Sequence, residues 1–501
     1  MFYEIELDQP LQDDKPHDHC GIFGIFGHPK SSLMTYYGLQ ALQHRGQEGS
    51  GIVTSEYDDA AGKYRFHAHR DFGLVNDVFR SGKIFYELLK GSSAIGHNRY
   101  STTGASNNKV NIQPLTVNYR QGNIAISHNG NLTNFQGIRQ RLQDEGTIFQ
   151  TTSDTEIILH LIARSRQTEQ VKQIIDALNQ IEGAFSIVIL TDDKLIAARD
   201  PYGWRPLAVG RVDGAFVVAS ETCAFDIISA EYLDDVRPGE VLVFDKETLE
   251  SGQPKSYMLN STANKPAYCI FEYIYFSRPD SKIFGESVDR VRRKLGKALA
   301  REHPVRPVET EKVIVINVPD SSNTATLGFA SENEKQGVKT KYEIGLIRSH
   351  YIGRTFIQPE QDDRDVKVKM KFNTVKGVLK DKEVVIVDDS IVRGTTSKQL
   401  VDLVRDAGPK KIHFRVSSPP IRFPCFYGMD FPKSDELIAN KADGDIEKIR
   451  ERLGVDSIGY LSLEKLLESV PHENQESYCT ACFSGEYPTQ VETRSKNQNE
   501  C

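Results

Sequence analysis

Residues 384–397 read V-V-I-V-D-D-S-I-V-R-G-T-T-S, and this stretch decides the fold of the second half of the chain. Its apolar start predicts a buried strand that ends at Asp388 and Asp389, and its last residues predict a loop that opens a helix. Backbone N–H groups at a helix N-terminus bind anions, and nearby hydroxyls add donors around a phosphate. The two aspartates are placed to hold ribose hydroxyls and Mg²⁺ at the carboxyl edge of a sheet. The alternative, a capped helix after an acidic turn, leaves two carboxylates desolvated without a cation.

The sequence on both sides of this stretch alternates between strands and helices. A helical segment at 288–301 precedes an apolar strand at 313–319, and a helix that starts at Thr396 leads to the strand I-H-F-R-V at 412–416. Nearly continuous apolar strands joined by helices are typical of a parallel α/β sheet. We therefore predict a doubly wound α/β domain over 279–490, followed by a disordered polar tail at 491–501.

The stretch at 384–397 resembles the 5-phosphoribosyl-1-pyrophosphate (PRPP) motif of type I phosphoribosyltransferases. Two companion segments share the resemblance: V-P-D-S-S at 318–322 is similar to the loop that receives pyrophosphate and metal, and H-Y-I-G-R-T-F-I-Q-P at 350–359 is similar to a loop that closes over the substrate. The resemblance implies Mg²⁺ on Ser321, Asp388 and Asp389. It implies PRPP contacts from the motif and the closing loop, namely Asp388, Asp389, Ser390, Arg393, Gly394, Thr395, Thr396, Ser397 and Arg354. Arg354 and Lys376 are candidates for balancing the charge of the leaving pyrophosphate, and solvated surface cations are the alternative.

Cys20 opens the run C-G-I-F-G-I-F-G after an acidic, proline-bearing segment at 1–19. A thiol at a new N-terminus needs no histidine as base, because its own α-amine has a pKa of about 8 and accepts the proton. We therefore expect residues 1–19 to be a leader removed by autoprocessing, with Cys20 as the nucleophile. The alternative for Cys20 alone is a small buried apolar residue.

Short β-type runs recur from Cys20 to Asp245 with turns between them, and two helical segments interrupt the runs. This pattern predicts a sandwich of sheets covered by helices over 20–250. The composition turns to Ser, Gly, Pro, Lys and Asn near 246–267, which predicts a linker at 251–278.

Polar runs follow several apolar strands of this half: H-R-G-Q-E-G at 44–49, G-H-N-R-Y-S-T-T-G at 96–104, S-H-N-G-N at 127–131 and T-S-D-T-E at 152–156. Each alone suits a turn or a cap equally well. In this order behind Cys20, they resemble the glutaminase domain of the class II amidotransferases, an N-terminal-nucleophile (Ntn) αββα sandwich. The resemblance implies that Arg99 binds the α-carboxylate of glutamine, Asp154 binds its α-ammonium, and Arg45 helps to close the site. It also implies an oxyanion hole made by Asn129 and the backbone N–H of Gly130. Trp204 and Asn98 depart from the family pattern, and Trp204 is expected to alter packing near the glutaminase site.

The chain holds seven cysteines, too few and too scattered for a disulfide framework in a chain of 501 residues. Cys479 and Cys482 form one C-x-x-C pair, whereas a structural zinc site usually shows two such pairs. Unrelated thiols are the alternative. One branch of the amidotransferase family carries a [4Fe–4S] cluster on cysteines in these contexts, together with a leader, and the resemblance implies Cys269, Cys425, Cys479 and Cys482 as ligands. Cys223 and Cys501 match no motif and are expected to be a buried residue and a tail thiol.

Together the two halves resemble the glutamine PRPP amidotransferases. The resemblance implies that glutamine is hydrolysed at Cys20 and that ammonia passes to PRPP, giving 5-phosphoribosylamine, pyrophosphate and glutamate, the first committed step of purine synthesis. It also implies a homotetramer and purine nucleotides as feedback inhibitors. An amidotransferase with another acceptor would need a sugar-isomerase domain or an ATP-binding loop, and a PRPP-sensing regulator would leave Cys20 unexplained.

Composition and charge set limits on partners and location. The formal net charge is −7 with no long run of one sign, so no footprint for nucleic acid or an anionic membrane is expected. No apolar stretch approaches the roughly 20 residues of a membrane span, and the acidic leader has no apolar core of a secretory signal. We therefore expect a cytoplasmic enzyme.

Overall fold

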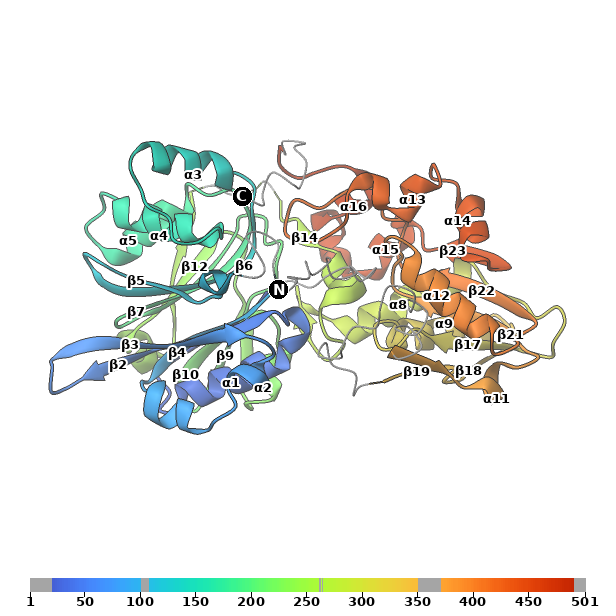
Figure 1. Cartoon of the computed structure of the whole chain (residues 1–501), viewed down its shortest axis with the longest axis horizontal. Helices are drawn as coiled ribbons and strands as arrows, with labels where there is room; N and C mark the ends of the chain where they lie inside the picture. Colours follow the sequence, from blue (N-terminus) through green and yellow to red (C-terminus); the bar gives the residue numbers. More distant parts are fainter. Residues whose placement is uncertain (1–19, 101–107, 261–262, 264, 350–370, 491–501) are drawn as a thin grey trace, which may run out of the picture. The chain divides into compact units, whose positions relative to one another are not determined.

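The computed structural model describes residues 20–100, 108–260, 263, 265–349 and 371–490. The chain divides into two compact units (Figure 1). The sandwich unit contains residues 20–294, 423–430 and 467–490 among those described, and the parallel-sheet unit contains 295–422 and 431–466. The predicted leader at 1–19, the closing loop with Arg354 and the tail at 491–501 lie outside the described residues.

Two antiparallel sheets form the centre of the sandwich unit. The first sheet has the order β11-β9-β10-β1-β4-β2-β3, and the second has the order β13-β12-β8-β7-β6-β5. The strands of the first sheet are β1 (Gly21–Phe26), β2 (Gly49–Asp58), β3 (Lys63–Phe72), β4 (Ser93–Arg99), β9 (Ala208–Val212), β10 (Ala215–Ala219) and β11 (Glu231–Asp235). Those of the second are β5 (Leu115–Tyr119), β6 (Gly122–Leu132), β7 (Gly183–Thr191), β8 (Leu195–Arg199), β12 (Glu240–Phe244) and β13 (Lys255–Met258).

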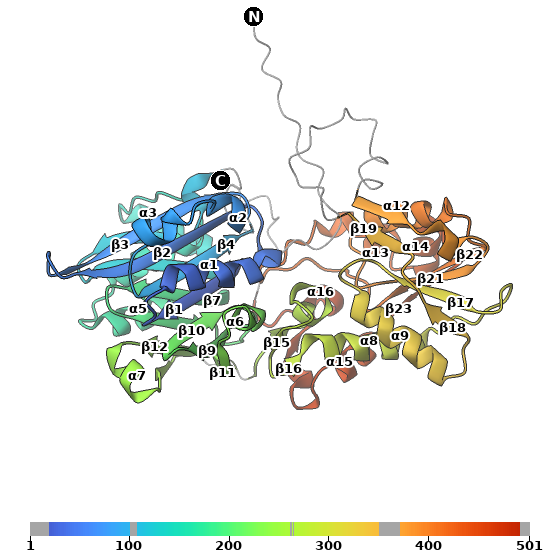
Figure 2. The same cartoon turned by 90° about the horizontal axis from the view of Figure 1, so that it is seen from below.

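Helices cover the outer face of each sheet. The first sheet packs against α1 (Ser31–Ala41), α2 (Val75–Val78) and α6 (Cys223–Asp226) through one apolar cluster. The second sheet packs against α3 (Phe135–Asp144), α4 (Thr155–Arg164) and α5 (Gln170–Leu178) through another. A third cluster fills the space between the sheets. The order helix, sheet, sheet, helix, visible in Figure 1, confirms the predicted αββα sandwich, and the view from below shows α1 in front of the strands (Figure 2).

The strand β1 shows why the C-G-I-F-G-I-F-G run suits this position. Ile22 and Phe26 point into the space between the sheets, whereas Phe23 and Ile25 pack under the helices. A strand covered on both faces needs apolar side chains at nearly every position. A Cβ at Gly24 would lie 2.8 Å from Val188 Cγ1 of the opposite sheet, so the glycine permits the close approach of the two sheets.

The sandwich unit extends beyond its predicted end. The predicted linker at 251–278 contains β13, which completes the second sheet after α7 (Lys246–Ser251). It also contains β14 (Tyr268–Cys269), which pairs in parallel with β24 (Tyr478–Cys479) near the end of the described chain. Segments 423–430 and 467–490 therefore belong to the sandwich unit, whereas we had predicted one continuous domain over 279–490. The sequence did not reveal this return, because the strands that bring it about are only two residues long.

A five-stranded parallel sheet with the order β18-β17-β21-β22-β23 forms the parallel-sheet unit, as predicted. Its strands are β17 (Val313–Asn317), β18 (Thr340–Tyr342), β21 (Glu383–Asp388), β22 (Lys411–Val416) and β23 (Ser457–Tyr460). The chain first moves from β17 to β18 on one side and then places β21 on the other. The sheet therefore has a switch point between β17 and β21, where open α/β sheets bind their ligands.

The remaining elements complete the two units. The longer helices are α8 (Val288–Glu302), α9 (Asn323–Lys335), α12 (Thr395–Arg405), α14 (Ile446–Leu453) and α15 (Leu463–Ser469). Short helices and strands are α11 (Lys376–Leu379), α13 (Ile438–Lys441), α16 (Ala481–Ser484), β15 (Lys282–Ile283), β16 (Glu286–Ser287), β19 (Leu346–Arg348) and β20 (Phe372–Thr374). Among the described residues, no helix is both long and apolar enough to cross a membrane.

Candidate active sites

The thiol of Cys20 lies immediately before β1, where its Sγ donates a weak hydrogen bond to the carbonyl of Tyr100 at 3.4 Å. Burial raises the pKa of Cys20 to about 11, and the charges of Glu48 and Asp154 act in the same direction. The Tyr100 contact and the Arg99 charge lower it only in part. The thiol is therefore protonated near neutral pH and needs a base before it can act as a nucleophile.

Two predicted substrate clamps lie within electrostatic reach of this thiol. Arg99 ends β4 and is 4% exposed, and burial lowers the pKa of its guanidinium. Asp154 immediately precedes α4 and accepts a hydrogen bond from Leu132 N at 3.1 Å. Burial opposes ionisation of Asp154, but His128 and the hydrogen bonds to its carboxylate lower the pKa overall. A buried cation and a buried anion therefore both act electrostatically on the nucleophile, a combination that suits an amino-acid substrate.

Asn129 lies on β6 and is fully buried, and neither its Nδ2 nor its Oδ1 has a partner among the described residues. A buried amide without partners costs about 1–3 kcal/mol, so a donor left free in this way points to a ligand. The next residue, Gly130, has φ +154°, and a Cβ there would lie 2.0 Å from the carbonyl oxygen of Ala184. Both features agree with the predicted oxyanion hole.

Arg45 has a different environment from the one predicted. Its Nη1 and Nη2 form ion pairs with Glu221 at 2.5 Å and Glu272 at 2.8 Å, and its Nε donates to the Cys20 carbonyl at 3.4 Å. The side chain is 1% exposed. Because its nitrogens already hold two carboxylates and the main chain of the nucleophile, Arg45 positions Cys20, and the geometry does not support a contact with glutamine.

Neither carboxylate partner of Arg45 is among the residues predicted from the sequence. Glu221 follows β10, and its side chain also contacts His44 at 2.8 Å and Ser281 at 2.7 Å. Glu272 lies inside the apolar run Tyr268–Phe276 and is fully buried. A single carboxylate in such a run is the signal that predicts a buried ion pair, because an unpaired charge there would be strongly destabilising.

The four predicted cluster ligands all belong to the sandwich unit. Cys269 pairs in register with Cys479 across β14 and β24, Phe423 N donates to the Cys482 carbonyl at 3.1 Å, and Tyr427 N lies 3.3 Å from Cys425 Sγ. None of these thiols forms a disulfide. Burial raises the pKa of Cys269 to about 11 and that of Cys479 to about 12, and it also raises the pKa of Cys482; neighbouring cysteines act in the same direction on these three thiols. Among the described residues, no three His, Cys, Asp or Glu side chains converge closely enough to hold a single metal ion.

Trp204 and Asn98, the two departures from the family pattern, are both buried. Trp204 is 1% exposed and stacks on Tyr427 with ring centroids 4.3 Å apart, so it packs against the thiol-bearing segment. Asn98 is fully buried, donates to the carbonyl of Leu39 and accepts from Ser50. Cys223 is buried at the start of α6, as predicted, and Cys501 lies outside the described residues.

The predicted phosphate-binding loops meet at the switch point of the parallel sheet. Ser322 Oγ, which precedes α9, donates to the carbonyl of Val387 at 2.8 Å, and Val318 N donates to the same carbonyl at 3.1 Å. Asp388 ends β21 and Asp389 follows it, each 2% exposed, while Ser321 in the adjacent loop is half-buried. The structure thus brings the predicted Mg²⁺ ligands to one edge.

The predicted anion site falls in the loop before α12. Gly394 has φ +83°, and the helix then begins at Thr395. Ser390 and Ser397 are buried, Thr396 is half-buried and Thr395 is exposed. The side chain of Arg393 forms an ion pair with Glu436 at 2.8 Å, and Lys376 lies exposed at the start of α11.

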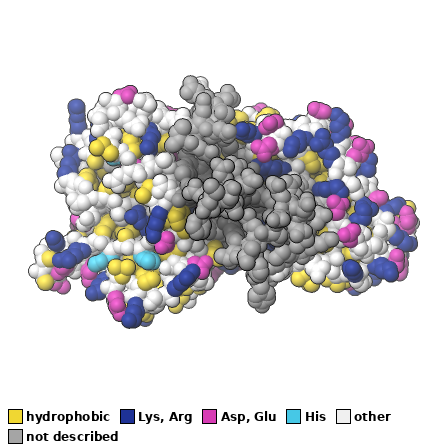
Figure 3. Space-filling view, viewed as in Figure 1, with side chains coloured by type: hydrophobic (Ala, Val, Ile, Leu, Met, Phe, Trp, Pro, Cys, Tyr) yellow, Lys and Arg dark blue, Asp and Glu magenta, His cyan; other side chains and the backbone are white. Residues whose placement is uncertain are grey.

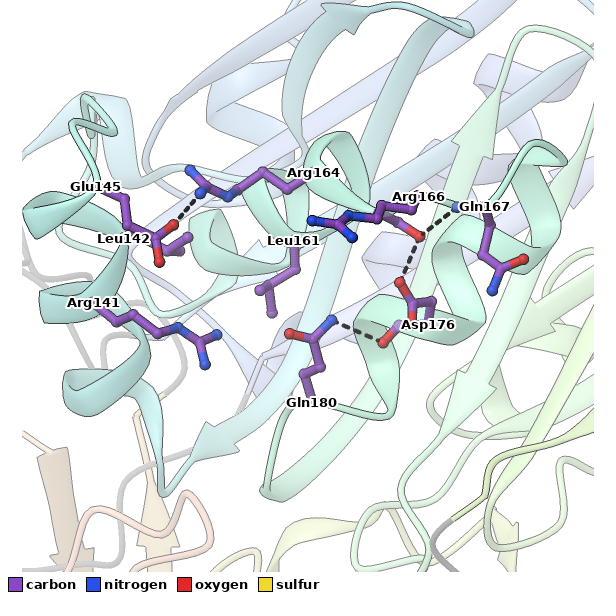
Figure 4. Close-up of a pocket in the computed structure, with 10 residues that line it drawn as sticks. Arg141, Leu142, Glu145, Leu161, Arg164, Arg166, Gln167, Asp176 and Gln180 are labelled. Carbon is purple, nitrogen blue, oxygen red and sulfur yellow. Dashed lines mark hydrogen bonds and ion pairs between the residues drawn. The ribbon is translucent and has the colours of Figure 1, made fainter.

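A cavity of about 410 Å³ lies on the outer helical layer of the sandwich unit (Figure 4). Arg141, Arg164 and Arg166 line it, and Arg164 is already paired with Glu145. Lys and Arg side chains are interspersed with Asp and Glu on the visible faces of both units (Figure 3). None of the predicted site residues lines the cavity.

Comparisons with known proteins show which family the chain resembles. A family model described as a glutamine amidotransferase domain matches residues 97–226. The chain is 48% identical over 481 residues to a chloroplastic amidophosphoribosyltransferase of Vigna aconitifolia, covering 96% of this chain and 93% of that one. A solved structure of the allosteric regulatory enzyme of purine biosynthesis is 43% identical, with a TM-score of 0.86 over 96% of this chain and 99% of that chain. The glutamine PRPP amidotransferase of B. subtilis, solved with ADP and GMP, is 44% identical, with a TM-score of 0.85 over 95% of this chain and 98% of that chain.

An Ntn sandwich with an amino-acid clamp around a cysteine, followed by a doubly wound sheet with a phosphate loop, defines a glutamine amidotransferase joined to a phosphoribosyltransferase. The similarity extends over nearly the whole length of both chains. The chain belongs to the amidophosphoribosyltransferase family.

Proposed function

We propose that Cys20, as the N-terminal residue left after removal of 1–19, hydrolyses glutamine for the first step of purine biosynthesis. The free α-amine takes the thiol proton, and the thiolate attacks the amide carbon of glutamine. Asn129 and Gly130 stabilise the oxyanion, ammonia leaves, and water hydrolyses the thioester to glutamate. Ammonia then displaces pyrophosphate from PRPP in the second unit and gives 5-phosphoribosylamine.

The observation that carries this proposal is the placement of the Cys20 thiol within reach of both Arg99 and Asp154. Glutamine presents one carboxylate and one ammonium group, and the site offers one charge to each. The raised pKa of Cys20 explains why the α-amine is needed, since a thiol with a pKa of about 11 is almost fully protonated at pH 7.

For the second half-reaction, we propose that PRPP binds at the edge between β17 and β21. The backbone N–H groups that follow Gly394 and the hydroxyls of Thr395, Thr396 and Ser397 hold the 5-phosphate, while Asp388 and Asp389 hold the ribose. Ser321 and the two aspartates suit Mg²⁺, which prefers oxygen ligands and usually binds through carboxylates and substrate phosphates. When bound, Mg²⁺ neutralises charge on the leaving pyrophosphate. The PRPP contacts of Arg354 and Arg393 remain predictions. Arg393 would make its contact in addition to its ion pair with Glu436.

We further propose that Cys269, Cys425, Cys479 and Cys482 hold a [4Fe–4S] cluster. Four thiols without disulfides, three of which have a pKa raised by burial, suit a group that binds thiolates. Only one close C-x-x-C pair is present among these cysteines, whereas a structural zinc site usually shows two such pairs. When bound, the cluster would cross-link the three segments of the sandwich unit.

Regulation and assembly follow from family membership as proposals. The B. subtilis relative was solved with ADP and GMP, which supports purine nucleotides as inhibitors of this chain. The homotetramer and the cytoplasmic location remain predictions, which analytical ultracentrifugation and cell fractionation would check.

Two variants test the proposed function. Cys20→Ala should abolish glutamine-dependent synthesis of phosphoribosylamine and leave ammonia-dependent synthesis intact. Asp388→Asn should reverse the pattern, with glutamine hydrolysis retained and PRPP use lost. Loss of both activities in Cys20→Ala would contradict the assignment of two separate sites.

A further inference from the structure

A chain of buried ion pairs leads away from Cys20 inside the sandwich unit. Arg45 contacts the Cys20 carbonyl through Nε, and its two terminal nitrogens bind Glu272 Oε1 and Oε2 at 2.8 and 3.0 Å. This paired geometry fixes the plane of the guanidinium as well as its position. Glu272 therefore orients the Arg45 guanidinium that contacts the main chain of the nucleophile, together with Glu221, which binds Nη1 at 2.5 Å.

Glu272 also binds a second arginine. Its Oε1 accepts a hydrogen bond from Arg205 Nη1 at 3.3 Å, and its Oε2 accepts one from Ser277 Oγ at 2.7 Å. Arg205 in turn donates through Nη2 to the carbonyl of Tyr427 at 2.8 Å. Glu272 lies three residues after Cys269, and Tyr427 lies two residues after Cys425.

The charges of this network are balanced and hidden from water. Arg45 and Arg205 face Glu221 and Glu272, and the side chains of all four are at most 1% exposed. Removal of one partner from such a network leaves an uncompensated charge, which then shifts or draws in water. Nothing in the hydrolysis of glutamine requires Glu272 to touch the substrate, so any effect on the reaction must act through Arg45.

We propose that Glu272 is a positioning residue for the glutaminase reaction, because it holds Arg45 under the Cys20 carbonyl and ties it through Arg205 to the segments that carry the four thiols. The inference rests on the proposed role of Cys20 and extends it. A change in the thiol-bearing segments then reaches the nucleophile through two arginines and one carboxylate, all within one unit.

Glu272→Gln tests this role, since glutamine keeps the size of the side chain and removes its charge. We expect kcat for glutamine to fall by about tenfold or more, as small displacements of a nucleophile cause, with KM changed by less than about threefold. Ammonia-dependent synthesis should be unchanged. The rate at which iodoacetamide labels Cys20, read by mass spectrometry of its peptide, should change in parallel with kcat, and Glu272→Asp should restore part of both.

Controls separate positioning from general stability. Glu240→Gln removes another buried carboxylate of the same unit, one that pairs with Arg237, and should leave kcat and the labelling rate unchanged. If Glu272→Gln does not fold, the double variant Glu272→Gln, Arg205→Gln removes one charge of each sign and carries the same test. An unaltered kcat and labelling rate, or equal loss of the glutamine and ammonia activities, would overturn the inference. Cys20→Ala is assayed alongside as a check on the proposed function itself. If this variant kept glutamine-dependent activity, the proposed role of Cys20 would be wrong.

Discussion

At the scale of single residues, Asn129 shows how a function can oppose stability. Its amide is buried without a partner among the described residues, whereas the equally buried amide of Asn98 is bonded to Leu39 and Ser50. A protein tolerates an unpaired buried amide when catalysis requires it. The two asparagines therefore make a matched pair for experiment.

Asn129→Ala should lower kcat for glutamine by about 10²–10³, the usual loss when one oxyanion donor is removed. Its melting temperature should not fall, because the alanine removes an unsatisfied polar group. Asn98→Ala should instead destabilise the protein by about 1–3 kcal/mol, because it leaves buried partners unpaired. Calorimetry and glutaminase assays check both variants, and a clear loss of stability in Asn129→Ala would count against the oxyanion role.

His97 gives the sandwich unit a specific sensitivity to acid. It is fully buried on β4, and burial lowers its pKa to about 3. The unfolded chain binds a proton to this histidine below a pKa of about 6.5, whereas the folded chain does not, so stability falls as the pH decreases. The loss begins near pH 6.5 and continues until the folded histidine titrates.

His97→Gln should remove this dependence. On going from pH 7 to pH 5, we expect the variant to lose about 2 kcal/mol less unfolding free energy than the parent chain. Trp204 is the only tryptophan and belongs to the sandwich unit, so its fluorescence during urea unfolding follows the relevant transition. Equal losses in parent and variant would show that His97 is charged or exposed in the folded state.

At the scale of elements, the predicted fold was confirmed where long, patterned segments decided it. The buried strand β21 and its phosphate loop, and the strand β1 after Cys20, lie where the sequence placed them. The predicted domain boundaries were wrong where the two-residue strands β14 and β24 decide the structure. The ion pair of Glu272 with Arg45 was likewise not predicted. Such contacts join residues far apart in the chain, and periodicity carries no information about them.

At the same scale, the left-handed turn at Gly394 before α12 can be tested by substitution. Its φ of +83° precedes α12, and an added Cβ would lie 2.3 Å from Ile438 Cδ1. Gly394→Ala should therefore destabilise the loop by about 1–3 kcal/mol and raise the KM for PRPP, while glutamine hydrolysis is retained. Gly377→Ala is the control, because that position in α11 has no atom within 4 Å of the added Cβ. Its effect on stability should be neutral or favourable, and an equal loss in both variants would contradict the role of the left-handed turn.

At the scale of the whole molecule, the sandwich unit is assembled from three separate segments of the chain. The last two, 423–430 and 467–490, carry three of the four thiols and reach the first segment through β14, Arg205 and Trp204. A cluster bound to all four thiols would add covalent links between the segments to these contacts. Its removal should therefore release the returning segments before the sheets unfold.

Cys482→Ser tests this dependence, with Cys223→Ala as the matched control, because Cys223 is buried in the same unit but is not one of the predicted ligands. Protein purified without oxygen should contain iron and sulfide in the control and lose most of both in Cys482→Ser. The emission of Trp204 should then shift to the red as its stacking on Tyr427 is lost, and limited proteolysis should cut within 423–430 or 467–490.

Stoichiometric zinc in the parent chain would contradict the cluster. Full iron content in Cys482→Ser would remove Cys482 from the ligands. Iron loss without a change in Trp204 emission or proteolysis would show that the segments hold together through protein contacts alone.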